Sequence, residues 1–88
     1  MILNFKIGDI VESKLGHDKT KKYIIFEVIN DRFLMVVNGK IRSLDKPKIK
    51  NVKHLKYLGE SQIIAKKIIN KEISDSEIQQ IIESFEQK

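Results

Sequence analysis

The hydrophobic residues of this chain follow two different spacings, and the change falls near residues 58–59. Before that point, short runs rich in β-branched and aromatic residues alternate with polar segments, a pattern typical of strands. After it, isoleucines recur at intervals of three and four residues, which is typical of amphipathic helices. The sequence therefore predicts an α+β protein that is mainly β with an α-helical tail.

The N-terminal part predicts a small antiparallel sheet. The apolar run at 23–29 is nearly continuous, so we expect its strand to be covered on much of both faces. Closing such a sheet on itself would remove its exposed edges, which favours an SH3-like barrel. The five predicted strands are residues 10–13, 23–29, 33–37, 40–44 and 52–58.

Two local signals predict how the middle of this sheet is connected. The Asn-Gly pair at 38–39 supplies the two positive-φ residues of a type I′ turn, and so predicts a hairpin between strands at 33–37 and 40–44. Pro47 cannot donate a ladder hydrogen bond. Residues 45–48 are therefore predicted to form a connection or a sheet edge.

Two helices are predicted in the tail. The first has a broad apolar face made of Ile63, Ile64, Ala65, Ile68 and Ile69. The second begins at Ser74, because Glu77 three positions later completes the pattern of a capping box. Residues 1–58 are thus expected to form the barrel and residues 59–88 a two-helix extension, whose apolar faces must be covered by the barrel or by another chain.

Positive charge is concentrated in the predicted sheet. The net charge of the chain is +5, but residues 1–57 hold 13 Lys or Arg against 6 Asp or Glu, whereas residues 58–88 hold 4 against 6. Residues 40–56 are the most basic segment, with 7 basic residues and 1 acidic residue. This distribution permits a polyanionic partner for the N-terminal part, although lysine runs are more often solvated faces.

Cationic side chains on two loops could neutralise neighbouring phosphates of RNA, and closure of the barrel could place both loops on one side. Recognition is expected to depend on RNA shape and backbone, because the sequence has no ribonucleoprotein aromatic signature. Tyr23 and Tyr57 could stack on a base if they are exposed, whereas Phe26 is expected in the core. The candidate RNA-binding residues are Lys14, His17, Lys19, Lys21 and Lys22 in one patch, and Arg42, Lys46, Lys48, Lys50 and Lys53, with His54 beside them, in the other.

Catalysis and cofactor binding have no support in the sequence. Cysteine is absent, which excludes disulfides, thiolate metal sites and a thiol nucleophile. His17 and His54 lack partners at metal-ligand spacing, and no nucleophile accompanies the acidic residues. We therefore expect a non-enzymatic protein without metal or cofactor, located in the cytoplasm and without a membrane partner.

Several segments resemble the KOW motif. They are Gly8-Asp9-Ile10-Val11, then Lys14, Gly16, His17, Asp18 and Lys19, and the apolar run at 23–26. The later segments at 38–42, 45–48 and 54–56 are similar to the rest of a bacterial group of KOW-domain proteins, which is itself similar to large-subunit ribosomal proteins of archaea and eukaryotes. The chain departs from many KOW motifs at His17 and Thr20, where they carry Arg and Gly. The resemblance covers residues 5–58 and implies an SH3-like barrel that binds RNA, ribosomal RNA above all.

A second hypothesis is a protein-interaction adaptor that acts at the ribosome or the transcription machinery. An uncovered helical face could bind a ribosomal protein or a second copy of the chain. The residues available for that contact are Ile64, Ile68, Ile78, Ile81, Ile82 and Phe85.

Overall fold

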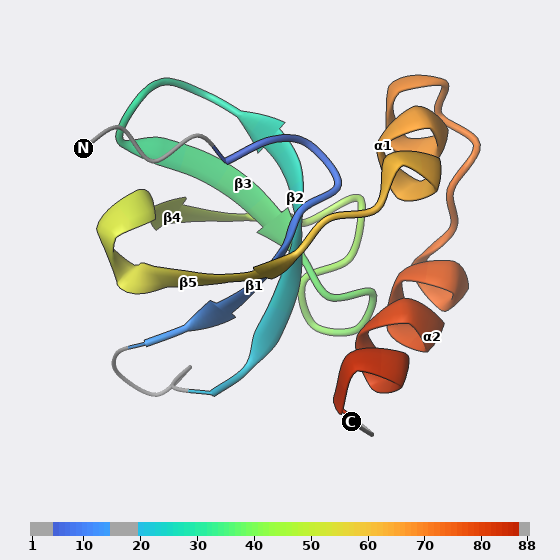
Figure 1. Cartoon of the computed structure of the whole chain (residues 1–88). Helices are drawn as coiled ribbons and strands as arrows, with labels where there is room; N and C mark the ends of the chain where they lie inside the picture. Colours follow the sequence, from blue (N-terminus) through green and yellow to red (C-terminus); the bar gives the residue numbers. More distant parts are fainter. Residues whose placement is uncertain (1–4, 15–19, 87–88) are drawn as a thin grey trace.

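The computed structural model describes residues 5–14 and 20–86, and it has an α+β fold in which a five-stranded antiparallel sheet precedes two helices (Figure 1). The strands are β1 Ile10–Ser13, β2 Lys22–Val28, β3 Phe33–Val37, β4 Lys48–Asn51 and β5 Leu55–Gly59. A short 3-10 helix, η2 Val52–His54, joins the last two strands, and the helices are α1 Gln62–Ile69 and α2 Asp75–Glu86.

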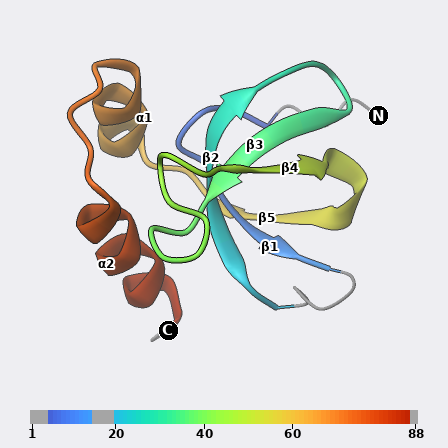
Figure 2. The same ribbon diagram turned by 180° about the vertical axis from the view of Figure 1, so that it is seen from behind.

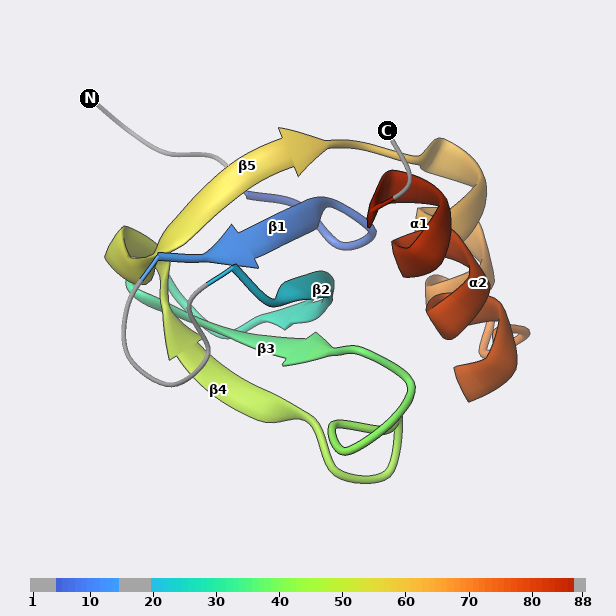
Figure 3. The same ribbon diagram turned by 90° about the horizontal axis from the view of Figure 1, so that it is seen from below.

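The sheet has the order β4-β3-β2-β1-β5, so the two strands that η2 connects are its edges. Within the described residues no ladder pairs β4 with β5, and the sheet is not closed. β2 is central and bends: Ile24 pairs with Ile10 on one side and with Val37 on the other, and the register with β3 shifts between Ile25 and Glu27. Figure 3 shows the resulting curvature from below.

The predicted strands at 10–13 and 33–37 are confirmed, and the run at 23–29 forms β2 one residue earlier. Tyr23, Ile24 and Ile25 are all buried, so this strand is covered on both faces at its start. The last predicted strand begins later than expected, because residues 52–54 form η2 and only Leu55–Gly59 pair with β1.

The strand predicted at 40–44 is wrong, and so is the type I′ turn before it. Gly39 has a φ of +79°, but Asn38 is not among the described residues with positive φ. Instead, the Asn38 side-chain oxygen accepts the backbone N–H groups of Lys40 and Arg42 at 2.9 and 3.0 Å. This side chain takes the donors that a β-ladder would need. Residues 38–47, called here the 38–47 loop, therefore connect β3 to β4 without forming a strand of their own.

The partner of β3 is β4, which follows Pro47 directly as an edge strand. The sequence left open whether residues 45–48 form a connection or a sheet edge. Residues 45–47 belong to the connection, and Lys48 begins the edge strand, so Pro47 lies outside the ladder.

Both predicted helices are present, and serine side chains cap them. The Ser61 hydroxyl accepts the N–H of Ile64 at 3.3 Å, and the Ser74 hydroxyl accepts the N–H of Glu77 at 3.2 Å. Each bond satisfies a donor that the first turn of a helix leaves without a partner. Glu77 also pairs with Lys67 of α1 at 2.5 Å, and this hydrogen bond holds the pKa of the Glu77 carboxyl below its ordinary value.

Apolar side chains fill two clusters, one on each face of the sheet. The first lies between the sheet and the helices and contains Ile10, Ile24, Val37, Ile64, Ile68, Ile78 and Ile82. The second lies on the concave face and contains Val11, Tyr23, Ile25, Leu34, Val36 and Leu55. The helices thus cover one face of the sheet, as Figure 2 shows from behind, while the curvature of the sheet covers the other.

Gly8 allows α1 to approach the sheet closely. Its φ is +92°, and a Cβ at this position would lie 2.9 Å from Ala65. Only glycine combines this backbone conformation with so short a distance to the helix.

Asp9 provides a pH-dependent contribution to stability. It is 3% exposed, and burial raises the pKa of its carboxyl above the ordinary value of 3.8, although the hydrogen bond from the Lys6 N–H at 2.8 Å opposes this. Because the fold disfavours the ionised form, stability is lost as the pH rises through the raised pKa. We expect Asp9→Asn to raise the melting temperature relative to wild type more at pH 7 than at pH 3. A difference that is constant between the two pH values in thermal denaturation would contradict this assignment.

Candidate nucleic-acid interface

The described candidate residues fall on three segments. Lys14, Lys21 and Lys22 flank the connection between β1 and β2, whereas Lys48 and Lys50 are in β4 and Lys53 is in η2. Arg42 and Lys46 are in the 38–47 loop. Two further predicted residues, His17 and Lys19, lie outside the described residues.

A first contact joins the β1–β2 end of the sheet to η2. The backbone N–H of Lys14 donates to the carbonyl of His54 at 2.9 Å. Lys14 and Lys53, which are 39 positions apart in the chain, are therefore near neighbours in space, and both are exposed. One member of each predicted patch lies at this end of the molecule.

A second contact joins β4 to β1 across the concave face. The Lys50 ammonium lies 5.9 Å from the centre of the Tyr23 ring and 3.4 Å from the Ser13 hydroxyl. The register explains this direction, since Lys50 pairs with Leu34, whose side chain belongs to the concave-face cluster. A lysine over an aromatic face is attracted by the ring quadrupole. Lys48 pairs with Val36 and projects from the same face.

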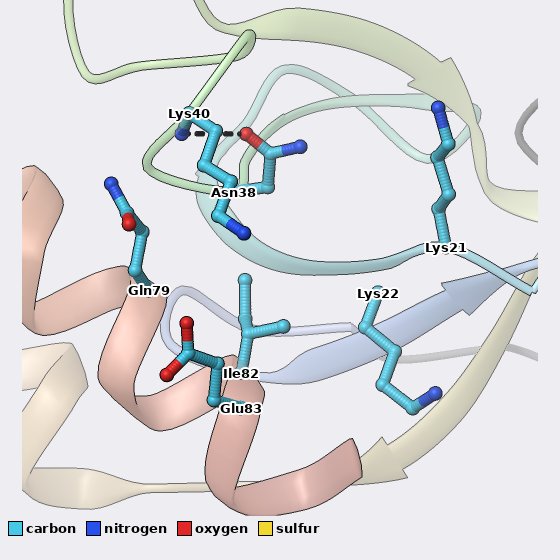
Figure 4. A pocket seen from close by; sticks show the side chains of 7 residues that line it. All are labelled: Lys21, Lys22, Asn38, Lys40, Gln79, Ile82 and Glu83. Carbon is cyan, nitrogen blue, oxygen red and sulfur yellow. Dashed lines mark hydrogen bonds between the residues drawn. The ribbon is translucent and has the colours of Figure 1, made fainter.

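A third meeting point is a pocket where β2, the 38–47 loop and α2 come together, called here the junction pocket (Figure 4). It is lined by Lys21, Lys22, Asn38, Lys40, Gln79, Ile82 and Glu83. In Figure 4 the Lys40 side chain extends toward Ile82, whereas the side chains of Lys21, just before β2, and Lys22, at its start, point in different directions. The pocket is thus lined both by two lysines of the first predicted patch and by the lysine that begins the most basic segment.

Acidic side chains lower the positive potential at this pocket. Lys22 forms an ion pair with Glu12 at 3.4 Å, and Glu83 lines the pocket wall. Lys21 and Lys40 are both exposed. A phosphate in solution can therefore reach both side chains.

Arg42 and Lys46 do not line the junction pocket. Lys46 precedes β4 and Lys53 follows it, so a ligand that met both would have to extend along the whole strand, about 13 Å. The candidate interface is therefore long rather than compact.

The aromatic hypothesis is wrong for Tyr23, which is 2% exposed and packs in the concave-face cluster. Tyr57 is 51% exposed, so its ring remains accessible to a base. Phe26 is partly buried and packs against the helix-facing cluster, as its core assignment predicted.

Three pocket residues escaped the sequence analysis as site residues. Lys40 was counted in the basic segment but was placed in a strand that does not form. Asn38 was interpreted as a turn residue. Gln79 gave no signal at all, because a glutamine on the polar side of a helix is ordinary and only packing brings it to the 38–47 loop.

Among the described residues, no group of three His, Asp or Glu side chains could hold a metal ion. In that same part of the chain, no helix is both long and apolar enough to cross a bilayer. In comparisons with known proteins, no family model matches the sequence and no curated protein matches it either.

Proposed function

We propose that this chain is a cytoplasmic RNA-binding module, without catalytic activity, that holds folded RNA through backbone phosphates. Ribosomal RNA is the first candidate, on the strength of the resemblance to KOW-domain proteins. The observation that carries the proposal is the meeting of basic residues from separate segments at the Lys14–His54 contact and in the junction pocket.

The proposed fold type is an SH3-like barrel of the KOW kind. Its support is the strand order, with edge strands linked by a 3-10 helix, together with the apolar cluster enclosed on the concave face. In such a barrel, loops from both halves of the sheet reach the same rim, which is the placement that a phosphate-binding surface needs.

The physical basis of binding would be counterion release. Each ammonium group that neutralises a phosphate frees a condensed cation, which favours the complex without reading the base sequence. Lys14 and Lys53 would bind at one end of the surface and Lys40 at the other, with Lys21 between them, because the Lys21 carbonyl accepts the Ser13 N–H at 2.9 Å next to Lys14. A folded RNA that presents phosphates along this line would fit best.

The alternative function, a protein-interaction adaptor, has fewer apolar helix residues available for a partner than the sequence suggested. Ile64, Ile68, Ile78 and Ile82 are buried against the sheet of the same chain, and Ile81 and Phe85 pack against that cluster. The apolar residues that remain exposed on α1 are Ile63 and Ile69.

The test is the salt dependence of binding to a structured ribosomal RNA fragment. With about four or five single-stranded phosphate contacts, log Kd should change with log salt at a slope of magnitude near 3, and paired RNA should steepen it. Fluorescence anisotropy between 50 and 300 mM KCl measures this slope. Absence of binding at 50 mM KCl, or an affinity that does not depend on salt, would reject the proposal.

A further inference from the structure

The 38–47 loop is held by α2 at two points. The Asp75 carboxylate oxygen Oδ1 accepts the backbone N–H of Leu44 at 2.8 Å. The Gln79 side-chain amide donates to the carbonyl of Gly39. One helical turn of α2 therefore forms hydrogen bonds with the loop on both sides of Lys40 and Arg42.

The loop backbone also fits closely against this helix. A Cβ on Gly39 would lie 2.4 Å from the carbonyl oxygen of Asp75 and 2.9 Å from the Gln79 side chain. The φ of +79° at Gly39 would strain most other residues as well. This position needs glycine because of α2, a reason unrelated to the hairpin turn that the Asn-Gly pair predicted.

Hydrophobic burial fixes the position of this helical turn. Ile78, which lies between Asp75 and Gln79 in α2, is fully buried against the sheet. Ile82 follows one turn later and belongs to the same cluster. The loop itself has no β-ladder, and its internal hydrogen bonds come mainly from the Asn38 side chain and the Arg42 carbonyl. The two α2 hydrogen bonds, together with the packing of Leu44 against the helix-facing cluster, tie the loop to the rest of the fold.

From these contacts we infer that α2 positions the proposed RNA-binding surface: Asp75 and Gln79 hold the 38–47 loop so that Lys40 lines the junction pocket, to which Lys21 also contributes. The inference rests on the proposed function and gives the C-terminal extension a role in it. Asp75 and Gln79 are positioning residues, since their effect passes through the loop. An unrestrained loop would have to be ordered when RNA binds, and that ordering lowers affinity.

The experiment compares the double variant Asp75→Ala, Gln79→Ala with wild type and with Ser76→Ala, Gln80→Ala, a matched control at exposed positions of α2. Amide hydrogen exchange at Leu44, together with Kd and its salt slope for the RNA fragment, is measured for each protein. In the first variant we expect faster exchange at Leu44 and a roughly tenfold higher Kd, the size of effect that loss of one or two hydrogen bonds produces. The control should match wild type in both readouts.

A single variant, Asp75→Asn, adds a rescue, because the asparagine side-chain oxygen can still accept the Leu44 N–H. It should exchange and bind as wild type does. Faster exchange with an unchanged Kd would overturn the positioning role and leave RNA binding intact. Unchanged exchange would overturn it too, since α2 would then not restrain the loop, and failure of wild type to bind the RNA would remove both proposals. Circular dichroism melts verify that every variant is folded.

Discussion

The double variant Lys21→Glu, Lys40→Glu should bind RNA far more weakly than wild type. Both side chains are exposed and line the junction pocket, so each reversal removes a phosphate contact and places a carboxylate near the RNA backbone. The salt slope should fall by about 1.4, because each single-stranded contact contributes about 0.7. At low salt we expect Kd to rise by about a hundredfold, measured by the same anisotropy titration.

The control for this prediction is Lys66→Glu, Lys71→Glu. These lysines are exposed as well, but they are on α1 and the link after it, and neither lines the junction pocket. Both double variants lower the net charge equally. Equal weakening by the two would mean that total charge, and not this surface, governs binding.

Ile78→Ala should destabilise the fold more than any surface change. Ile78 is completely buried where α2 meets the sheet, and its truncation removes transfer free energy and leaves a cavity. We expect a loss of about 3 kcal/mol in the free energy of unfolding, a large share of the 5–15 kcal/mol typical of small domains. In a chain of this size that corresponds to a melting temperature about 15 °C lower, measurable by circular dichroism.

Ile63→Ala serves as the comparison, because Ile63 is 71% exposed on α1. It should change the free energy of unfolding by no more than about 0.5 kcal/mol. If Ile78→Ala melted within a few degrees of wild type, the packing of α2 on the sheet would be wrong, and with it the positioning of the 38–47 loop.

Local sequence signals predicted the elements whose stability is decided locally. The isoleucine spacing of the tail and the capping box at Ser74 specified two helices, because a periodic apolar face and a capping hydroxyl act within a few residues. The β-branched run at 23–29 likewise predicted a strand buried on both faces. These signals were sufficient because no distant segment competes with them.

The main error, at residues 38–44, has a local cause and a distant one. The Asn38 side chain takes the N–H groups of Lys40 and Arg42, and α2 binds the same loop through contacts that no local signal contains. Asn38-Gly39 usually closes a hairpin. Here Asp75 and Gln79, more than 30 positions away, bind the backbone at Leu44 and Gly39 instead. The pairing of β3 with β4 was also missed. Lysines that alternate around a proline are typical of a solvent-exposed connection, so the sequence did not predict a strand there.

The basic character of the candidate surface was evident from the sequence, but its arrangement was not. Charge counts selected Lys14, Lys50 and Lys53 without indicating that Lys14 meets η2 or that Lys50 reaches Ser13 over the Tyr23 ring. The sequence left base stacking open for Tyr23 only if it were exposed, and the curvature of the sheet buried it.

The amino-acid sequence by itself thus determined the class of fold, the helices with their caps and the half of the chain that carries the positive charge. These properties depend on residue type and on spacing within a few positions. Tertiary structure decided which strand pairs with β3, which lysines adjoin one another and that Gln79 contacts the 38–47 loop. Such pairings depend on distances between segments far apart in the chain, and only the joint burial of the sheet and helices sets those distances.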